Sequence, residues 1–287
     1  MKIVIAALVL AAGLGCQGSR RAAGPGMVSD HSMEVAAASI STLQTRLDIA
    51  SHNVANAHTT GFKATRVVLS EMPYSERVLD RADGSRVSAA VGAGVRIVGT
   101  KLDMSQGCPT LTGGTLDVMV DGAGFLIVRS DSPAGGGRMY TRAGNLSKNA
   151  DGELVLANDQ GQRLEPGITM PQEAMSVSID KSGRIFVQFP GNVEPQEVGQ
   201  IQIARFAQPE SLKAIGAGLY VETPESGQPL EGSPGTEARG MILQGYLEGS
   251  NVSIVRELLE AERVASLYQA WAPFGFSGRS VAAAPAR

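Results

Sequence analysis

The side chains that most often perform catalysis or bind metals are poorly placed relative to one another in this chain. His52 and His58 are six residues apart on a predicted helix, so they point to different faces and cannot share a metal ion as an i, i+4 pair could. Asp151 precedes Gly152 and Asp180 lies in a predicted turn, where Asp favours hydrogen bonds to the local backbone over acid–base chemistry. We therefore predict that the chain is not an enzyme and that it uses no metal and no cofactor.

A glycine cluster gives a weak match to a nucleotide-binding loop. Gly92 and Gly94 are followed by Gly99, but the third glycine of the dinucleotide fingerprint is missing, and the segment has the pattern of a strand. Close backbone packing or a β-bulge explains these glycines better. The formal net charge is −3 and no long basic run occurs, which argues against nucleic acid as a partner.

Residues 1–26 have the composition of a secretory signal followed by a linker. Lys2 precedes an apolar run, residues 3–15, which ends at Cys16 and is too short to span a membrane as a stable helix. Three interpretations remain open: Cys16 is lipidated, the segment is an ordinary cleaved signal, or the chain starts at Met27. We expect contact with a membrane only if Cys16 is lipidated. If Cys16 is processed or removed, Cys108 is left alone, so a disulfide framework is not expected.

The element that follows is a predicted helix with a narrow apolar seam, within residues 27–66. The seam residues are spaced 3, 4, 3, 4, 3 along the sequence, and they are Ile40, Leu43, Leu47, Ala50, Val54 and Ala57. This is the spacing of a helix that packs along a thin stripe, as in a coiled coil. A seam this narrow cannot build a globular core, so the helix needs a partner along its length. Gly61 is well placed to supply the positive φ that ends it.

A second coiled-coil-type helix is predicted within residues 250–272. Asn251, Val252 and Ser253 could cap its start, and Pro273 stops it before a tail at 273–287 that we expect to be flexible. Its seam consists of Ile254, Leu258, Ala261, Ala265 and Tyr268. We predict that it pairs with the helix at 27–66. On periodicity alone, the alternative that both helices simply cover the region between them stays open.

The region between the helices, residues 67–249, has the pattern of a mainly-β body. The clearest hairpin joins strands at 176–179 and 184–189 through a turn at 180–183, with alternate apolar residues on each side. Further strands are predicted at 91–100, 116–120, 124–129, 138–141, 153–156 and 197–206, with a polar link at 80–88 and a short helical turn within 207–215. The fold class is therefore α+β, with a β-body inserted between two terminal helices.

Three separated motifs in this sequence resemble those of the flagellar rod and hook proteins. The first runs roughly L-D-x-x-x-N-N-x-A-N-x-x-T-x-G-F-K and matches at Leu47, Asp48, Asn53, Ala55, Asn56, Thr59 or Thr60, Gly61, Phe62 and Lys63, with His52 in place of its first asparagine. The second matches at Leu116, Asp117, Val118, Gly122, Gly124, Phe125, Tyr140, Thr141, Arg142 and Gly144. The third, G-[FY]-x-E-x-S-N-V, matches at Gly245, Tyr246, Glu248, Ser250, Asn251 and Val252. The resemblance spans residues 27–268.

The resemblance implies a structural subunit of the bacterial flagellar basal body. The length and residues Gly92 to Arg96 favour the distal rod, which spans the periplasm, polymerises through terminal helices and transmits torque for motility. The implied partners are further copies of the chain and other rod, hook and ring proteins. The residues expected to serve subunit assembly are Ile40, Leu43, Leu47, Asn53, Val54, Asn56, Gly61, Phe62, Lys63, Asn251, Leu258 and Tyr268. The alternative is a membrane-anchored lipoprotein relative, lipidated at Cys16, that binds a partner without polymerising.

Two features leave details of assembly open. Asn53 and Asn56 could be solvated or could end the helix, whereas the resemblance places their amides between neighbouring subunits, where buried polar groups fix register. In the last helix the family's Q-R-A-Y segment keeps only its aromatic residue, Tyr268, and Glu262 replaces an apolar residue. Because Pro273 also shortens this helix, the departures weaken the expectation of tight polymerisation more than that of family membership.

Overall fold

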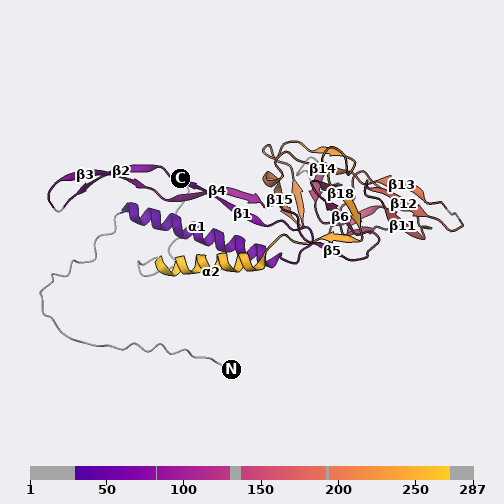
Figure 1. Ribbon diagram of the computed structural model, residues 1–287, viewed down its shortest axis with the longest axis horizontal. Coiled ribbons are helices and arrows are strands. Elements are labelled where there is room, and N and C mark those ends of the chain that lie inside the picture. The colour runs from indigo at the N-terminus through magenta and orange to yellow at the C-terminus, as the bar shows by residue number, and fades with distance from the viewer. Residues whose placement is uncertain (1–29, 82, 130–136, 192–193, 272–287) are drawn as a thin grey trace, which may run out of the picture.

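The protein is elongated and has a helical end and a β-rich end (Figure 1). The computed structural model describes residues 30–81, 83–129, 137–191 and 194–271. The two helices and a long β-ribbon form one end, and the remaining strands form a body at the other end. The predicted α+β class, with a mainly-β body between terminal helices, is confirmed. The signal-like segment with Cys16, and Pro273 with the tail at 273–287, lie outside the described residues.

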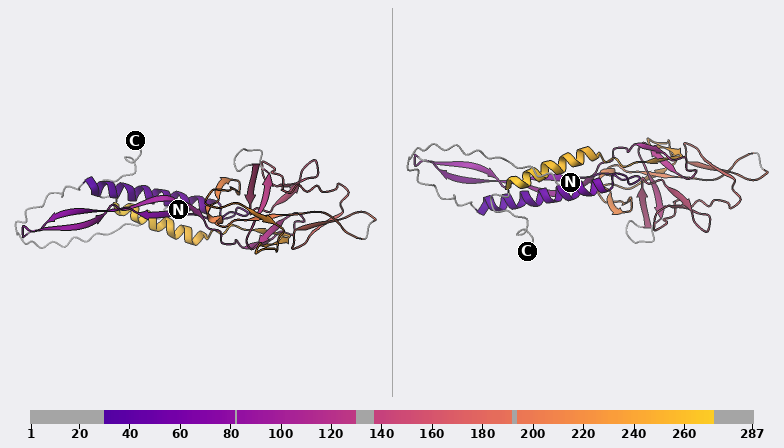
Figure 2. Two further views of the ribbon diagram at one scale, coloured as in Figure 1. Left: turned by 90° about the horizontal axis from the view of Figure 1, so that it is seen from above. Right: turned by 90° about the horizontal axis from the view of Figure 1, so that it is seen from below.

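The two terminal helices lie side by side, as both views of Figure 2 show. Helix α1 spans Asp30–Ala55 and helix α2 spans Ile254–Trp271. The helix predicted within 27–66 is therefore shorter than that segment, because α1 ends at Ala55 and the chain turns through Gly61 into a strand. None of the helices within the described residues is both long and apolar enough to cross a membrane.

A β-ribbon runs along α1 and extends beyond its start (Figure 1). Strand β1 (Thr65–Glu71) pairs with β4 (Val95–Leu102), and β2 (Tyr74–Asp80) pairs with β3 (Arg86–Gly92), all antiparallel. The strand predicted at 91–100 is divided in the structure, because β3 ends at Gly92 and β4 begins at Val95. The segment 80–88, predicted as a polar link, contains the end of β2, a turn and the start of β3. Because most residues of the ribbon are half-buried or exposed, the apolar alternation of a strand with one covered face is weak here.

The body combines several small antiparallel sheets. In chain order its strands are β5 (Pro109–Leu111), β6 (Val118–Asp121), β7 (Phe125–Arg129), β8 (Arg138–Thr141), β9 (Leu146–Lys148), β10 (Leu154–Leu156), β11 (Ser176–Ile179), β12 (Arg184–Gln188), β13 (Gln196–Gln200), β14 (Ile203–Arg205), β15 (Lys213–Gly216), β16 (Leu219–Val221), β17 (Leu230–Gly232), β18 (Met241–Gln244) and β19 (Tyr246–Glu248). One sheet has the order β15-β16-β8-β7-β14-β17 and another the order β11-β12-β13, and β5–β19, β6–β18 and β9–β10 pair separately. The turn η2 (Pro209–Ser211) confirms the predicted helical turn.

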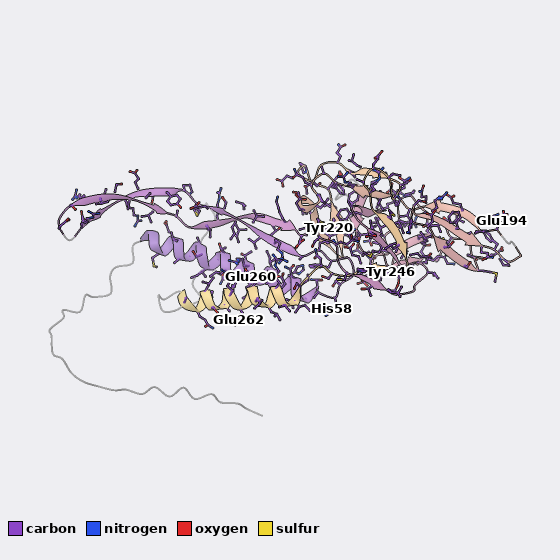
Figure 3. The ribbon with its side chains drawn as sticks, in the orientation of Figure 1. His58, Glu194, Tyr220, Tyr246, Glu260 and Glu262 are labelled. Carbon is purple, nitrogen blue, oxygen red and sulfur yellow. The ribbon has the colours of Figure 1, made fainter. Side chains whose placement is uncertain are left out.

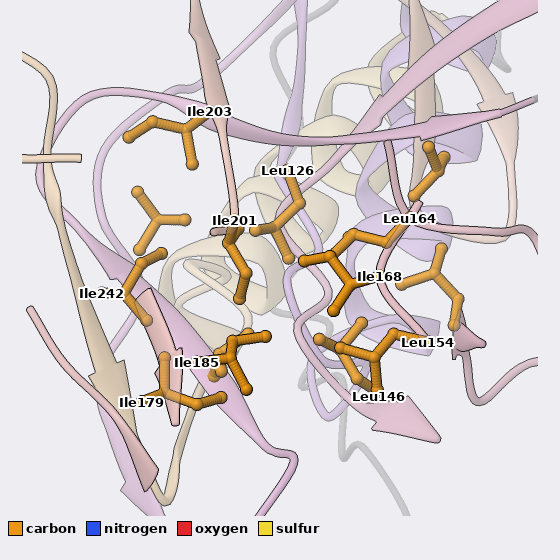
Figure 4. Packing of buried hydrophobic residues seen from close by; sticks show 14 of the residues in the cluster. Leu126, Leu146, Leu154, Leu164, Ile168, Ile179, Ile185, Ile201, Ile203 and Ile242 are labelled. Atoms are coloured by element: carbon orange, nitrogen blue, oxygen red, sulfur yellow. The ribbon is translucent and has the colours of Figure 1, made fainter. Parts of the chain in front are cut away.

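Aliphatic side chains from these strands fill the core of the body (Figure 4). Leu154, Ile185, Ile201 and Ile203 are wholly buried, and the predicted hairpin at 176–189 is confirmed by the pairing of β11 with β12. The predicted strand at 197–206 divides at Ile201, whose N–H donates to the carbonyl of Gly183. The segment thereby passes from one sheet to the next, and the body gains a core of its own, independent of the helices.

Candidate assembly interface and its junction with the body

A buried ionic cluster joins the exit of α1 to the β-body. At its centre lies Glu248, whose carboxylate accepts hydrogen bonds from Lys63 Nζ at 2.6 Å, Arg142 Nη1 at 3.2 Å and the Gly107 N–H at 2.9 Å. Glu248 is 0% exposed and Lys63 is 1% exposed. The three sequence motifs supply one charged residue each to this cluster, which we call the junction cluster (Lys63, Arg142 and Glu248).

Backbone carbonyls balance the surplus positive charge of the junction cluster. Lys63 also donates to the Ser105 carbonyl at 2.7 Å, and Arg142 donates to the carbonyls of Val120 at 3.0 Å and Gly122 at 2.7 Å. Burial lowers the pKa of Lys63 and of Arg142, and the charge of Glu248 opposes both shifts. Each cation therefore depends on Glu248 to stay charged in the interior, and the cluster with its carbonyl partners joins five separate segments of the chain.

Two asparagines bind the backbone around this cluster. Asn251 accepts from the Ala64 N–H at 2.8 Å and donates to the Asp103 carbonyl at 2.7 Å. Asn53, which is 0% exposed, pairs with both the N–H and the carbonyl of Thr65, and its amide also donates to Glu257. Within the predicted cap 251–253, Asn251 therefore does not cap α2, whereas the Ser253 hydroxyl accepts from the Arg256 N–H at 3.5 Å. Both amides instead fix how the chain leaves α1 and enters α2.

We predict that Asn251→Ala lowers the free energy of unfolding by about 1–3 kcal/mol, because the buried Ala64 N–H and the Asp103 carbonyl lose their hydrogen-bond partner. Urea unfolding followed by circular dichroism measures the change. Asn145→Ala is the matched control, since its amide donates to one carbonyl, that of Ala157, near the surface. Equal losses in the two variants would contradict the role of Asn251 in the junction.

The helix exit itself is built from local contacts. The Asn56 amide donates to the His52 carbonyl at 2.9 Å and its oxygen accepts from the Thr59 hydroxyl, so Asn56 closes the end of the helix. Phe62 is half-buried and packs edge-on against the ring of His52, with centroids 5.6 Å apart. Gly61 has the predicted positive φ, +67°, but it follows the end of α1 at Ala55 by six residues, and its N–H donates to the Glu248 carbonyl at 2.7 Å.

The two helices contact each other through both apolar and charged side chains. From α1, Ala36, Ile40, Leu43 and Ala50 are buried. Ion pairs link Arg46 on α1 to Glu260 on α2, and Arg66 on β1 to Glu257 on α2. Figure 3 shows Glu260 on the side of α2 that faces α1 and Glu262 on the far side. The pair is therefore held in a fixed orientation within one chain.

Much of the predicted seam of α2 is not covered by the chain's own residues. Leu258 is 55% exposed and Ile254 is 39% exposed, and Leu47 on α1 is 38% exposed. Val255 and Leu259, one position along from the predicted seam, are exposed as well. Val54 and Tyr268 are half-buried. The helix pair thus carries a set of large apolar side chains that face solvent.

The structure divides the predicted assembly residues into two groups. Asn53, Gly61, Lys63 and Asn251 contact their own chain, and the first three are buried. Leu47 and Leu258 remain free for a partner. Glu248, Arg142 and Glu257, which organise the junction, are not among the residues predicted from the sequence to serve assembly. Charged residues at matched motif positions, Glu248 and Arg142, were the signal that could have identified two of them.

Within the ranges 30–81, 83–129, 137–191 and 194–271, metal-ligating side chains are not grouped into a site. In the described part of the chain, no set of three or more His, Cys, Asp or Glu side chains could hold a metal ion. His58 lies near the exit of α1 (Figure 3), and both His52 and His58 are exposed. The positions of these residues are consistent with a structural junction and a helical contact surface.

Two protein-family models match the chain. Residues 33–63 match the model described as flagella basal body rod protein, and residues 119–187 match the D1 domain of the flagellar hook protein FlgE/F/G. The first match covers α1 and its exit, and the second covers β6 to β12 of the body. Together they describe the class of flagellar hook and rod proteins.

Curated relatives match over most of the chain. The flagellar basal-body rod protein FlgG of Caulobacter vibrioides is 38% identical over 234 residues, which is 79% of this chain and 87% of the relative. FlgG of Agrobacterium fabrum is 35% identical with the same coverage, and FlgG of Bacillus subtilis is 34% identical over 76% of this chain and 83% of its own. The chain belongs to the flagellar basal-body rod protein family. It is accordingly a structural component of the flagellar rod that serves motility, and not an enzyme.

Proposed function

We propose that the protein is a subunit of the distal rod that polymerises with further copies of itself and transmits torque. The observation that carries the proposal is the solvent exposure of Leu47, Ile254, Val255, Leu258 and Leu259 on the helix pair. Large exposed apolar patches on a soluble protein mark interaction sites. Similarity to FlgG supports the distal position. The neighbouring partners would be other rod, hook and ring proteins.

In this proposal the predicted assembly residues serve in two ways. Leu47, Val54, Leu258 and Tyr268 contact neighbouring subunits. Ile40 and Leu43 hold α1 against its own chain. The junction residues, Asn53, Asn56, Gly61, Phe62, Lys63 and Asn251, act on assembly indirectly, because they set the direction in which the helix pair leaves the body. A stiff junction is what a rotating shaft requires, since torque applied to the body must reach the helices without bending.

We predict that Leu258→Asp abolishes assembly and leaves the monomer folded. The side chain is 55% exposed in one copy, so the monomer loses little, whereas each interface would bury a charge in place of a leucine. Losing the burial of one leucine costs about 1.5–3 kcal/mol, which raises the concentration needed for assembly by about tenfold or more. Sedimentation across a protein concentration series measures this, and soft-agar motility should be lost.

The matched control is Leu230→Asp on the body, where Leu230 on β17 is 57% exposed. It introduces the same charge at the same exposure but away from the helices, and assembly should persist. Assembly of Leu258→Asp at the wild-type concentration would contradict the proposed helical interface. Unfolding of Leu258→Asp in urea at the wild-type midpoint is required for the comparison to be valid.

A further inference from the structure

A groove of about 650 Å³ lies between α1, β1 and α2 on one side of the helix pair. Ile49 from α1, Leu69 from β1 and Val255 and Leu259 from α2 contribute apolar surface to its walls. Leu69 is 40% exposed, Leu259 61% and Val255 69%. The β-ribbon and the helices thus leave an open apolar channel that no described segment of the chain fills.

The groove is positively charged. Four arginines, Arg46, Arg66, Arg256 and Arg263, line it together with two glutamates, Glu257 and Glu260. Arg46 and Arg66 are neutralised by those glutamates. Arg263 forms no ion pair with any described residue, and Arg256 is attracted to Asp103 without a direct ion pair. Two guanidinium groups therefore remain available beside the exposed Val255 and Leu259.

The outward face of α1 has the opposite charge. Glu34 and Asp48 are exposed on it, 14 residues and nearly four helical turns apart, so they lie on the same side of the helix. Each comes directly after an exposed apolar residue in the sequence: Glu34 after Met33, which is 46% exposed, and Asp48 after Leu47, which is 38% exposed. Neither carboxylate forms an ion pair within the described residues, and the exposed positions of α1 from Met33 onward include no lysine or arginine.

We propose that the groove of one copy receives the outward face of α1 from a second copy. Leu47 would pack against Val255 and Leu259, and the carboxylate of Asp48 would pair with Arg263 or Arg256. The inference rests on the proposed self-assembly and names the two surfaces that perform it. Charge complementarity selects this occupant, because an acidic apolar helix face is the ligand that a basic apolar groove prefers.

The two surfaces lie on different sides of the same helix pair. Arg46 and Ala50 of α1 face the groove, whereas Asp48 is two residues from each and therefore points away from it. The groove of one copy therefore meets the outward face of another copy, and because these are two different surfaces the contact is heterologous. A heterologous contact that does not close into a ring repeats into an open helical array.

Charge exchange on full-length protein tests this pairing. We expect Asp48→Arg and Arg263→Glu each to raise the concentration needed for assembly by about tenfold or more, since each places like charges face to face. A mixture of the two variants should assemble within about threefold of wild type, because each surface then finds a complementary one. Asp151→Arg and Lys213→Glu, both exposed on the body, apply the same changes of charge away from the helices and should leave assembly unchanged.

The outcomes separate the two proposals. If the wild-type protein does not sediment as an assembly at any concentration, the proposal of self-assembly is contradicted, and so is the groove pairing that rests on it. If the wild type assembles and both charge variants assemble equally well, the groove pairing alone is overturned. Loss of assembly in both variants without recovery in the mixture also overturns it, because the two residues then act at unrelated places.

Discussion

Replacing Glu248 with glutamine is expected to lower the free energy of unfolding by about 3–5 kcal/mol. The substitution keeps the shape of the side chain and removes its charge. Lys63 and Arg142 would then remain buried as cations with no anion between them. Because domains of this kind have total stabilities of about 5–15 kcal/mol, the loss is a large share of the whole.

The expected effect is local as well as global. Lys63 belongs to the exit of α1, Gly107 to the loop before β5, and Arg142 to the end of β8, and Glu248 contacts all three. Without the carboxylate, the exit of α1 and the loops around it should show faster amide exchange, while strands β11 and β12 keep their protection through the separate core of the body. Urea unfolding and hydrogen exchange measure the two effects.

Glu231→Gln is the control for Glu248→Gln. Glu231 pairs with Arg138 at 2.7 Å, but both side chains are partly exposed, at 30% and 43%. An exposed pair of this kind contributes at most about 1 kcal/mol. If the two glutamine variants unfold at the same urea concentration, the buried cluster does not hold the junction. An increase in stability on removing the charge of Glu248 would contradict it equally.

The sequence predicted those elements that carry a local signal. The hairpin of β11 and β12 has alternating apolar residues and an Asp180 turn within fourteen residues, and both features are local to the segment. The positive φ of Gly61 was predicted because only a few residues can adopt that backbone conformation, but α1 ends at Ala55, before Gly61 is reached. The ribbon of β1 to β4 has no wholly covered face, so its strands have a weak pattern, and only β4 falls largely within a predicted strand, at 91–100.

The junction could not be derived from spacing, because its partners are far apart in the chain. Lys63 and Glu248 are 185 residues apart, and Asn53 and Glu257 are 204 apart. Asn53, Lys63 and Glu248 occupy matched motif positions, but a motif does not say which of its residues contact one another, and Glu257 lies outside the motifs. The helical seam shows the same limit: its period predicted an apolar stripe, and only the packing of α1 against α2 and the ribbon decides that Ile40 is covered while Leu258 is not.

A methyl group at Gly61 is expected to disrupt the same junction by steric exclusion. With φ at +67°, any side chain at this position is strained by about 1–2 kcal/mol. A Cβ built there would lie 2.5 Å from the Ala143 nitrogen and 2.6 Å from the Arg142 carbonyl carbon. These are backbone atoms beside the junction cluster, so relief requires the exit of α1 to move away from the body.

We therefore expect Gly61→Ala to lower the free energy of unfolding by about 2–5 kcal/mol, from backbone strain together with forced overpacking. Gly161→Ala separates the two causes: Gly161 has φ +56° and nothing lies within 4 Å of its Cβ position, so only strain, about 1–2 kcal/mol, is added. Urea unfolding gives both values, and soft-agar motility should be lost in Gly61→Ala alone. If both variants lose the same stability, close approach of the helix exit to residues 142–143 does not constrain the junction, and Gly61 serves only as a turn residue.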